Sequence, residues 1–372
     1  MHRFKQNSVT IVFLAFLFLV SVCLFALPKS DYSENEKRML AKFPELNGDS
    51  IAGGTFGKDF ETYLADHFPA RDMFYGIYSY AQLYIGRNGQ SGIYASKDGY
   101  LIPTPATLNE DIATSNIAIF AQFAQQYDLP AVMMAVPNPG YILDEKLPDN
   151  HLEYMDDSVY RMLAEQAGNV NVVDLRDTFN NAQGQMYYRT DHHLTAAGSY
   201  EMYLAYCNAI GVAPTEFSCV QTNDGFYGTG YSKSGLWLKD PDTIEIWKPE
   251  NPSAFKVTIV ESGKTEVYDS LYFEGHLENM DQYPVYLDGN HALTLIENQN
   301  VKNGKRLLLI KDSYAHCFAT YAAEDYEMIC MVDLRYYKEF TSQLIKDYQL
   351  NEILYLYGVE NLAGSTDIAS LW

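Results

Sequence analysis

Hydrophobic and polar residues follow one another along most of this chain in an order that predicts an α/β fold. Beyond residue 112, apolar residues at helical spacing, among them Ile117, Phe120 and Phe123, precede the wholly apolar run 131–136. An amphipathic helix followed by a short apolar run is typical of a helix that covers a buried strand. The same reasoning predicts further strands at 170–175, 306–310, 328–332 and 352–359, with helices at about 156–167, from 196, at 314–323 and at 337–348. Strands that alternate with helices favour one mainly parallel sheet with helices on both faces.

Two regions depart from this alternation. Residues 33–85 have apolar positions at helical spacing, and residues 92–102 have the pattern of a small hairpin with its turn at 97–99. From about 220 to 300, glycines, aromatic residues and short alternating runs indicate a β-rich insertion. We therefore expect a membrane segment at 1–29, a helical and hairpin region at 30–111, and an α/β domain at 112–372 that contains the insertion.

The segment 9–27 is long and apolar enough to cross a membrane. Its 19 residues would span about 28 Å as a helix. Arg3 and Lys5 precede it, which places the N-terminus in the cytoplasm and the remaining chain outside. The absence of a small-x-small cleavage pattern after the segment favours an uncleaved, single-pass anchor, whereas removal as a signal peptide would give a secreted protein.

Composition narrows the possible partners and the redox state. A formal net charge of −22 would repel a phosphate backbone, which argues against binding to nucleic acid. Four cysteines follow the apolar segment, namely Cys207, Cys219, Cys317 and Cys330. No pair of them has the spacing of a metal site, and an oxidising compartment is compatible with a disulfide such as Cys207–Cys219 or with free buried thiols.

Candidate chemistry comes from two short stretches that lie far apart in the sequence. Asp191 and His193 are separated by one residue, and in an extended segment they would project to the same side while His192 projects to the other. Ser313 directly follows the predicted strand 306–310 and precedes a helix, which is where open α/β sheets place their functional groups. We expect a Ser-His-Asp triad in which the Ser313 hydroxyl lies within roughly 2.6–3.5 Å of a His193 nitrogen.

Each part of this site has an alternative interpretation. Ser313 could only cap its helix, and Asp191 and His193 with His316 could bind a metal, although adjacent histidines of an extended chain would not share one ion. Asn290 could donate to an oxyanion or occupy a hairpin turn. We favour the triad and expect no metal or other cofactor. Residues expected at the substrate or the oxyanion are Asn290, Tyr188, Arg189, His192 and His316.

The stretch 187–193, read with Thr195 and Gly198, resembles the signature of the bacterial DHHW family, whose members are similar to the alginate O-acetylation proteins of the cell envelope. Further matches occur at 33–38, 43–46, 66–69, 71–72 and 311–315. The resemblance implies an SGNH-hydrolase-like α/β fold in a permuted order, with Asp191 and His193 ahead of the nucleophile Ser313. Two positions depart from the expected patterns: Leu194 replaces the family's tryptophan, and Lys311 stands where SGNH enzymes carry glycine.

This resemblance implies an extracytoplasmic esterase or O-acyltransferase that acts on acetyl groups of a cell-surface polysaccharide. A membrane protein that supplies the acyl group is a further expected partner. The alternative is a non-catalytic, carbohydrate-binding or scaffold protein of an envelope assembly, with the aromatic-rich insertion as its binding surface. An enzyme would lose its function without the triad residues, whereas a binding protein would not.

Overall fold

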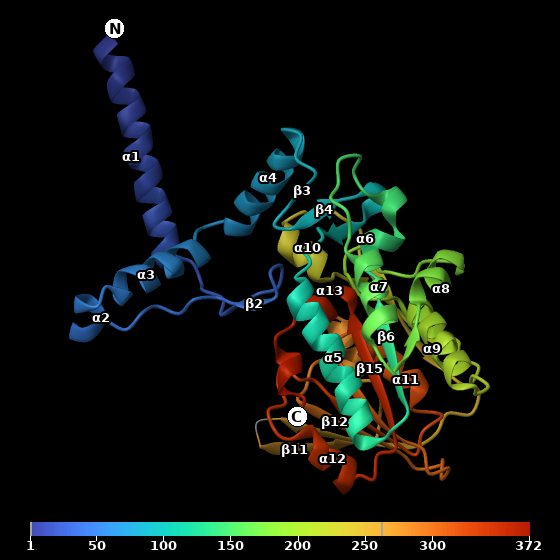
Figure 1. Ribbon diagram of the computed structural model, residues 1–372. Coiled ribbons are helices and arrows are strands. Elements are labelled where there is room, and N and C mark those ends of the chain that lie inside the picture. The colour runs from blue at the N-terminus through green and yellow to red at the C-terminus, as the bar shows by residue number, and fades with distance from the viewer. Residues whose placement is uncertain (1, 262) are drawn as a thin grey trace. The chain divides into compact units, whose positions relative to one another are not determined.

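The computed structural model describes residues 2–261 and 263–372 and divides into two compact units (Figure 1). The first unit contains the chain up to Ser91 together with Tyr231–Leu238, and the second contains Gly92–Gly230 and Lys239–Trp372. The hairpin at 92–102 therefore belongs to the same unit as the α/β sheet.

The first unit is mainly helical. It begins with α1 (His2–Ala26), in which Ser8–Ala26 has a mean hydropathy of 2.9, so that its length and composition suit a membrane anchor or a signal sequence. The other elements of this unit are β1 (Tyr32–Ser33), β2 (Arg38–Met39), α2 (Gly48–Ala52), α3 (Thr55–Asp66), α4 (Arg71–Tyr84) and β3 (Gly89–Gln90).

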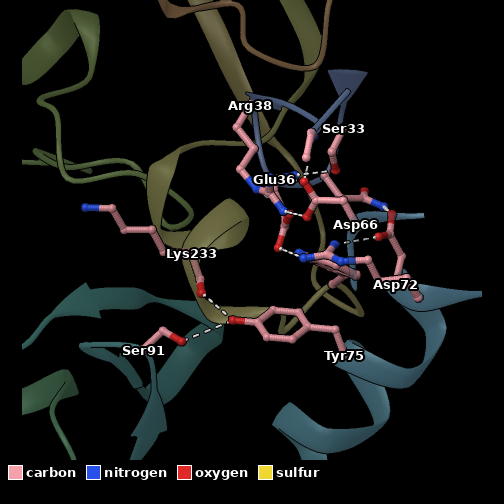
Figure 2. A network of polar contacts seen from close by, with 12 residues as sticks. Ser33, Glu36, Arg38, Asp66, Asp72, Tyr75, Ser91 and Lys233 are labelled. Carbon is pink, nitrogen blue, oxygen red and sulfur yellow. Dashed lines mark hydrogen bonds and ion pairs between the residues drawn. The ribbon is translucent and has the colours of Figure 1, made fainter. Parts of the chain in front are cut away.

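A network of charged groups holds the first unit together (Figure 2). Arg38 makes two hydrogen bonds to the Asp66 carboxylate, at 2.5 and 2.9 Å, and also pairs with Glu36. Arg71 contacts the same Glu36 at 2.8 Å, which links α4 to the β1–β2 turn. The hydrogen bonds from Arg38 lower the pKa of Asp66 to about 2, so this carboxylate stays charged. The motifs at 33–38 and 66–72, which lie about 30 residues apart in the sequence, thus meet in one network of ion pairs and hydrogen bonds.

The second unit is built on an eight-stranded sheet in the order β11-β10-β12-β14-β13-β15-β6-β7. Its strands are β6 (Ala131–Val136), β7 (Asn171–Val173), β10 (Phe255–Glu261), β11 (Lys264–Tyr268), β12 (Leu293–Asn298), β13 (Arg306–Lys311), β14 (Met328–Val332) and β15 (Glu352–Gly358). The five strands predicted as parallel do pair in parallel, and Leu307 and Val172 lie in the same sheet. The predicted α/β sheet is confirmed.

Helices cover both faces of this sheet because its inner strands are apolar on both sides. On β13, Leu307 and Leu309 point into one core and Leu308 and Ile310 into the other. One core is covered by α8 (Leu175–Asn181), α9 (Ala196–Ile210) and α11 (Ala315–Ala322). The other is covered by α5 (Glu110–Tyr127), α7 (Asp156–Gln166), α12 (Thr341–Asp347) and α13 (Val359–Gly364). The result is a three-layer α/β/α arrangement (Figure 1).

The β-rich insertion extends the sheet and adds a separate ribbon. Strands β10, β11 and β12 join the edge at β14 in antiparallel pairing, whereas β8 (Ser218–Phe226) and β9 (Asp242–Lys248) pair only with each other. This unit also contains β4 (Ile93–Ala95), β5 (Leu101–Pro103) and α6 (Pro139–Ile142), whereas α10 (Thr229–Ser234) begins in it and has most of its residues in the first unit. The strand expected at 170–175 is shorter than predicted, because Asp174 caps α8 through a hydrogen bond from the Arg176 N–H.

Candidate active site

Asp191 and His193 lie on a tight loop that precedes α9. The loop is closed by a bridge between Tyr187 and Leu194 and by a hydrogen bond from the Tyr188 N–H to the His193 carbonyl, at 3.1 Å. Thr195 then caps α9 by accepting a hydrogen bond from the Gly198 N–H, as its position in the sequence predicts. These contacts fix both ends of the loop.

A buried carboxylate and a glycine hold the middle of the loop. Asp242 accepts hydrogen bonds from the backbone N–H groups of Arg189 and Thr190, at 2.9 and 2.7 Å. Gly228 lies so close to Asp191 that a Cβ atom there would be 2.1 Å from the Asp191 Cβ. The next residue, Thr229, donates its N–H to Asp191 Oδ2 at 2.5 Å. The 228–229 backbone therefore packs directly against the Asp191 carboxylate and orients it.

Ser313 is held at the carboxyl end of β13 by its neighbour Asp312. The fully buried Asp312 carboxylate accepts hydrogen bonds from the N–H groups of Tyr314 and Gly358 and from Asn361 Nδ2, at 3.0, 2.8 and 2.7 Å. Burial raises the pKa of Asp312, and these three donors partly offset the increase. The carboxylate thus ties the turn after β13 to the end of β15. Within residues 2–261 and 263–372, the Ser313 N–H makes no hydrogen bond and is available to an oxyanion.

The two stretches meet at hydrogen-bonding distance. His193 Nε2 lies 2.7 Å from the Ser313 Oγ, and His193 Nδ1 lies 2.5 Å from Asp191 Oδ1. Asp191 also accepts the His193 N–H at 2.8 Å, so one carboxylate oxygen fixes both the backbone and the ring. Asp191 and His193 are 3% and 7% exposed. Asp191 therefore fixes the Nδ1–H tautomer of His193 and leaves Nε2 to accept the Ser313 proton.

Two tyrosines fix the imidazole plane. Tyr283 stacks on His193 with ring centroids 3.9 Å apart, and its hydroxyl donates to the Ser313 carbonyl at 3.2 Å. Tyr314 contacts the same ring edge-on, and its hydroxyl donates to the His192 carbonyl. The segment that carries Tyr283 is closed by Asp288, which accepts hydrogen bonds from His276 and His291 at 2.6 and 3.1 Å. The insertion thus contributes one wall of the site.

A buried lysine, Lys311, lies at the end of β13, just before the turn that carries Ser313. Lys311 is 2% exposed, and its Nζ contacts His316 Nε2 at 2.8 Å and Asp333 Oδ2 at 3.1 Å. Arg335 pairs with the same Asp333. Burial and the neighbouring Lys311 charge hold the pKa of His316 well below its usual value, so its ring is neutral and its Nε2 accepts a hydrogen bond from Lys311 Nζ. SGNH enzymes carry glycine at this position, and a glycine has no side chain that could make the contacts of Lys311 with His316 and Asp333.

The expectation that His192 faces away from His193 is wrong. The 191–193 segment is bent rather than extended, so the two imidazole rings lie side by side with centroids 4.0 Å apart. His192 Nδ1 is 3.6 Å from Asp191 Oδ1, and ligand atoms of Asp191, His192 and His193 lie within 4.8 Å of one another. The argument against a shared metal ion therefore fails. The Ser313 hydroxyl nevertheless contacts His193, whose two ring nitrogens already lie at hydrogen-bonding distance from Asp191 and Ser313.

Other candidate residues have structural contacts. Tyr188 is buried and packs edge-on against Phe226 and Tyr283. Arg189 is held by the Pro241 carbonyl and Asp242. Asn290 is exposed, follows a turn with positive φ at 287–289, and accepts a hydrogen bond from Arg335. His316 lies against Lys311, as described above.

The four cysteines that follow α1 are all free thiols in the structure. Cys207 is buried, Cys219 is exposed, and both are free thiols, so the disulfide considered for this pair is not formed. Cys317 and Cys330 are free and buried as well. Of the two alternatives that the sequence left open, the structure has the free thiols.

Several residues of the site carry no recognisable signal in the sequence. Gly228, Asp242, Tyr283 and Asn361 reach it from elements that lie 35 to 170 positions away from the Asp-His stretch. Of these four residues, only Asn361 could have been proposed from the sequence, because it follows the end of the predicted strand 352–359, where α/β sheets place functional groups.

The fold has counterparts among solved structures. A DHHW family protein from Eubacterium siraeum matches with a TM-score of 0.64 and 21% identity, over 76% of this chain and 95% of that one. Bacillus cereus PatB1, in a structure with a sulfonyl adduct, matches with a TM-score of 0.63 and 22% identity, over 74% and 97% of the two chains. The O-acetyltransferase domain of Pseudomonas putida AlgJ matches with a TM-score of 0.50 and 16% identity, over 75% and 98%. No curated protein sequence matches the chain.

These similarities define the class of the fold, which is an SGNH-hydrolase-like α/β sandwich. Residues 148–332 match the family model described as DHHW protein, and the chain belongs to this family. The matched segment contains Asp191, His193 and Ser313.

Proposed function

We propose that this protein is an extracytoplasmic serine esterase or O-acyltransferase that acts on acetyl groups of a cell-surface polysaccharide. The observation that carries the proposal is the continuous hydrogen-bonded line from Asp191 through His193 to the Ser313 Oγ, with distances of 2.5 and 2.7 Å. Such a line is the arrangement that activates a serine hydroxyl as a nucleophile.

The residues take the following parts in the reaction. The Ser313 Oγ attacks the acyl carbonyl carbon while His193 Nε2 accepts the hydroxyl proton. The carbonyl oxygen becomes an oxyanion that the Ser313 N–H can stabilise at the N-terminal end of α11. The bond between the acyl carbon and the leaving oxygen then breaks, and His193 returns the proton to that oxygen. Water or a sugar hydroxyl, deprotonated by His193, then attacks the acyl carbon. The bond from this carbon to the Ser313 Oγ breaks, His193 returns the proton to the Oγ, and the product is the free acid or the acylated sugar.

Two fold neighbours support the substrate class. PatB1 has been solved with a sulfonyl adduct, and the AlgJ domain is described as an O-acetyltransferase. The apolar helix α1 fits a location at the outer face of a membrane, where a cell-surface polysaccharide would be in reach. A membrane protein that hands over the acyl group is part of the proposal for the transferase activity.

The test is hydrolysis of p-nitrophenyl acetate by the full-length protein in detergent, with covalent labelling by phenylmethylsulfonyl fluoride. Ser313→Ala and His193→Ala should each reduce kcat/KM by more than about 1,000-fold, because triad members act as a unit. Asp191→Asn should retain more activity, and His192→Ala more still. Mass spectrometry should find the sulfonyl label on Ser313. A Ser313→Ala protein with wild-type activity, or a label on another serine, would refute the proposal.

A further inference from the structure

A cavity lies beside the inserted region and contains none of the residues Asp191, His193 and Ser313 in its lining. Its volume is about 170 Å³, and it opens between the β8–β9 ribbon, the β10–β11 end of the sheet and the last turn of α11. Its aromatic lining comes from Phe217, Trp247, Phe255 and Tyr272, and its polar lining includes Lys248, Asp269, Ser270 and Glu324. Ser313 lies just before the other end of α11. At 1.5 Å per residue, the seven steps from Ala315 to Ala322 separate the two ends of this helix by roughly 10 Å along its axis.

The aromatic side chains of this cavity are fixed before any ligand binds. Trp247 donates its indole N–H to Glu245 at 2.8 Å and packs on Tyr200 with centroids 5.6 Å apart. Tyr272 donates its hydroxyl to the Trp247 carbonyl at 2.6 Å. Both rings therefore keep one orientation, and little side-chain entropy remains to be lost when a flat ligand stacks on them.

Charge decides which flat ligand the cavity can take. Asp269 and Glu324 both line it, and the chain as a whole carries −22, so a polyanion or a phosphorylated ligand is repelled. Lys248 Nζ already lies 5.4 Å from the centre of the Tyr272 ring, where a cationic ligand would stack. A purely apolar ligand would cover the charged lining groups Lys248, Asp269 and Glu324 without forming any polar contact with them.

An uncharged sugar ring satisfies all of these features. Its C–H face packs on an aromatic ring, and its hydroxyls donate to carboxylates and to serine. The volume is below the roughly 300–1,000 Å³ of pockets for drug-sized ligands, which fits one six-membered ring. We infer that the cavity is a subsite for one pyranose unit of an uncharged glycan, and that it holds the polymer whose acetyl group reacts at Ser313. This inference rests on the proposed function.

Holding a polymer at a second point raises its effective concentration at the first. The subsite should therefore lower KM for an acetylated polymer and leave a small ester unaffected. O-acetylated glucomannan serves as the uncharged polymer, O-acetylated alginate as the polyanionic one, and p-nitrophenyl acetate as the small ester. Trp247→Ala and Asp269→Ala in the full-length protein should raise KM for acetylated glucomannan at least fivefold, with kcat and the rate on p-nitrophenyl acetate unchanged. Trp372→Phe is the matched control, because this tryptophan packs on Phe123 on the other side of the sheet.

A direct binding measurement separates this inference from the proposed function. Deacetylated glucomannan should change the tryptophan fluorescence of the wild-type protein in a saturable way. Asp269→Ala keeps Trp247 as the reporter and, as an exposed residue, leaves the fold intact, so it should shift the titration midpoint at least fivefold. Binding without activity on any ester would refute the proposed function alone. Activity on p-nitrophenyl acetate without fluorescence change, or equal KM effects with acetylated alginate, would refute the subsite.

Discussion

Gly228 offers a sharp test of the site, because it touches the triad without contributing a side chain to it. The Cβ of an alanine there would lie 2.1 Å from the Asp191 Cβ and 2.4 Å from its Oδ2. Ordinary van der Waals contact begins at about 3.5 Å. Either Asp191 or the 228–229 backbone must therefore move by more than about 1 Å in Gly228→Ala.

The size of the effect follows from that displacement. Moving Asp191 breaks its 2.5 Å contact with His193 Nδ1 and its hydrogen bond from Thr229. A misplacement of about 1 Å in a catalytic group costs on the order of 100-fold in rate, which is about 2.7 kcal/mol of transition-state stabilisation. Overpacking of a buried position costs a further 1–3 kcal/mol of folding free energy. We expect kcat on p-nitrophenyl acetate to fall about 100-fold and the Tm to fall by several degrees.

Gly364→Ala is the matched control. A Cβ there meets no atom within 4 Å, and the residue ends helix α13, so this variant should keep its activity and a Tm equal to or slightly above that of the wild-type protein. Esterase assays and thermal unfolding by circular dichroism measure both variants. If Gly228→Ala keeps both wild-type activity and wild-type Tm, the packing of Asp191 against this backbone is not as described.

Three further predictions concern other parts of the chain. Lys311→Met should lower the free energy of unfolding in urea by about 2–3 kcal/mol, because it leaves His316 Nε2 buried and unpaired while Asp333 keeps its ion pair with Arg335. The control Lys338→Met, at an exposed position, should change the free energy of unfolding by less than about 1 kcal/mol. Equal effects of the two substitutions would contradict this prediction. Burial lowers the pKa of His291, but the hydrogen bonds that its ring donates to Asp288 and Glu261 outweigh burial and raise this pKa. The histidines in turn lower the pKa of Asp288. The cluster therefore stabilises the fold fully between the ordinary pKa values of Asp and His, and it loses that contribution as the pH rises through the raised pKa of His291. The Tm difference between wild type and His291→Gln should therefore be larger at pH 5.5 than at pH 8, and a constant difference would contradict the cluster. The protein should sediment with membranes, and in intact cells residues 30–372 should be digested by added protease; full protection would reject the expected topology.

The sheet could be predicted because its strands are among the least ambiguous segments of the chain. The run 131–136 is apolar at every position and only six residues long, which favours a strand buried on both faces over a helix. Asp174 shows where this reasoning stops. The residues around it have the pattern of a strand that continues to 175, but the Asp174 side chain caps α8. No feature of the sequence distinguishes an aspartate that caps a helix from one that lies in a strand.

The candidate site was predictable only in its polar groups. Asp191, His193 and Ser313 could be paired because their positions relative to strands and helices follow general rules of α/β sheets. The orientation of His192 was mispredicted because it depends on backbone angles in a bent loop, which no two-residue periodicity describes. Gly228 and Tyr283 contact the triad through the inserted region, and the sequence holds no pattern that links a glycine at 228 to an aspartate at 191.

The position of β15 in the sheet has a consequence for the timing of synthesis and export. This strand is the last in the sequence, yet it lies between β13 and β6 and pairs with both. Until it emerges, the earliest strands β6 and β7 cannot join the later ones, and Asp312 lacks its partners Gly358 and Asn361. Folding must therefore wait for contacts between segments more than 200 residues apart, which is intrinsically slow. A chain that still lacks β15 carries Asp191, His193 and Ser313 but not the contacts that hold the turn at Ser313, so the candidate site is assembled only after the whole domain has been synthesised.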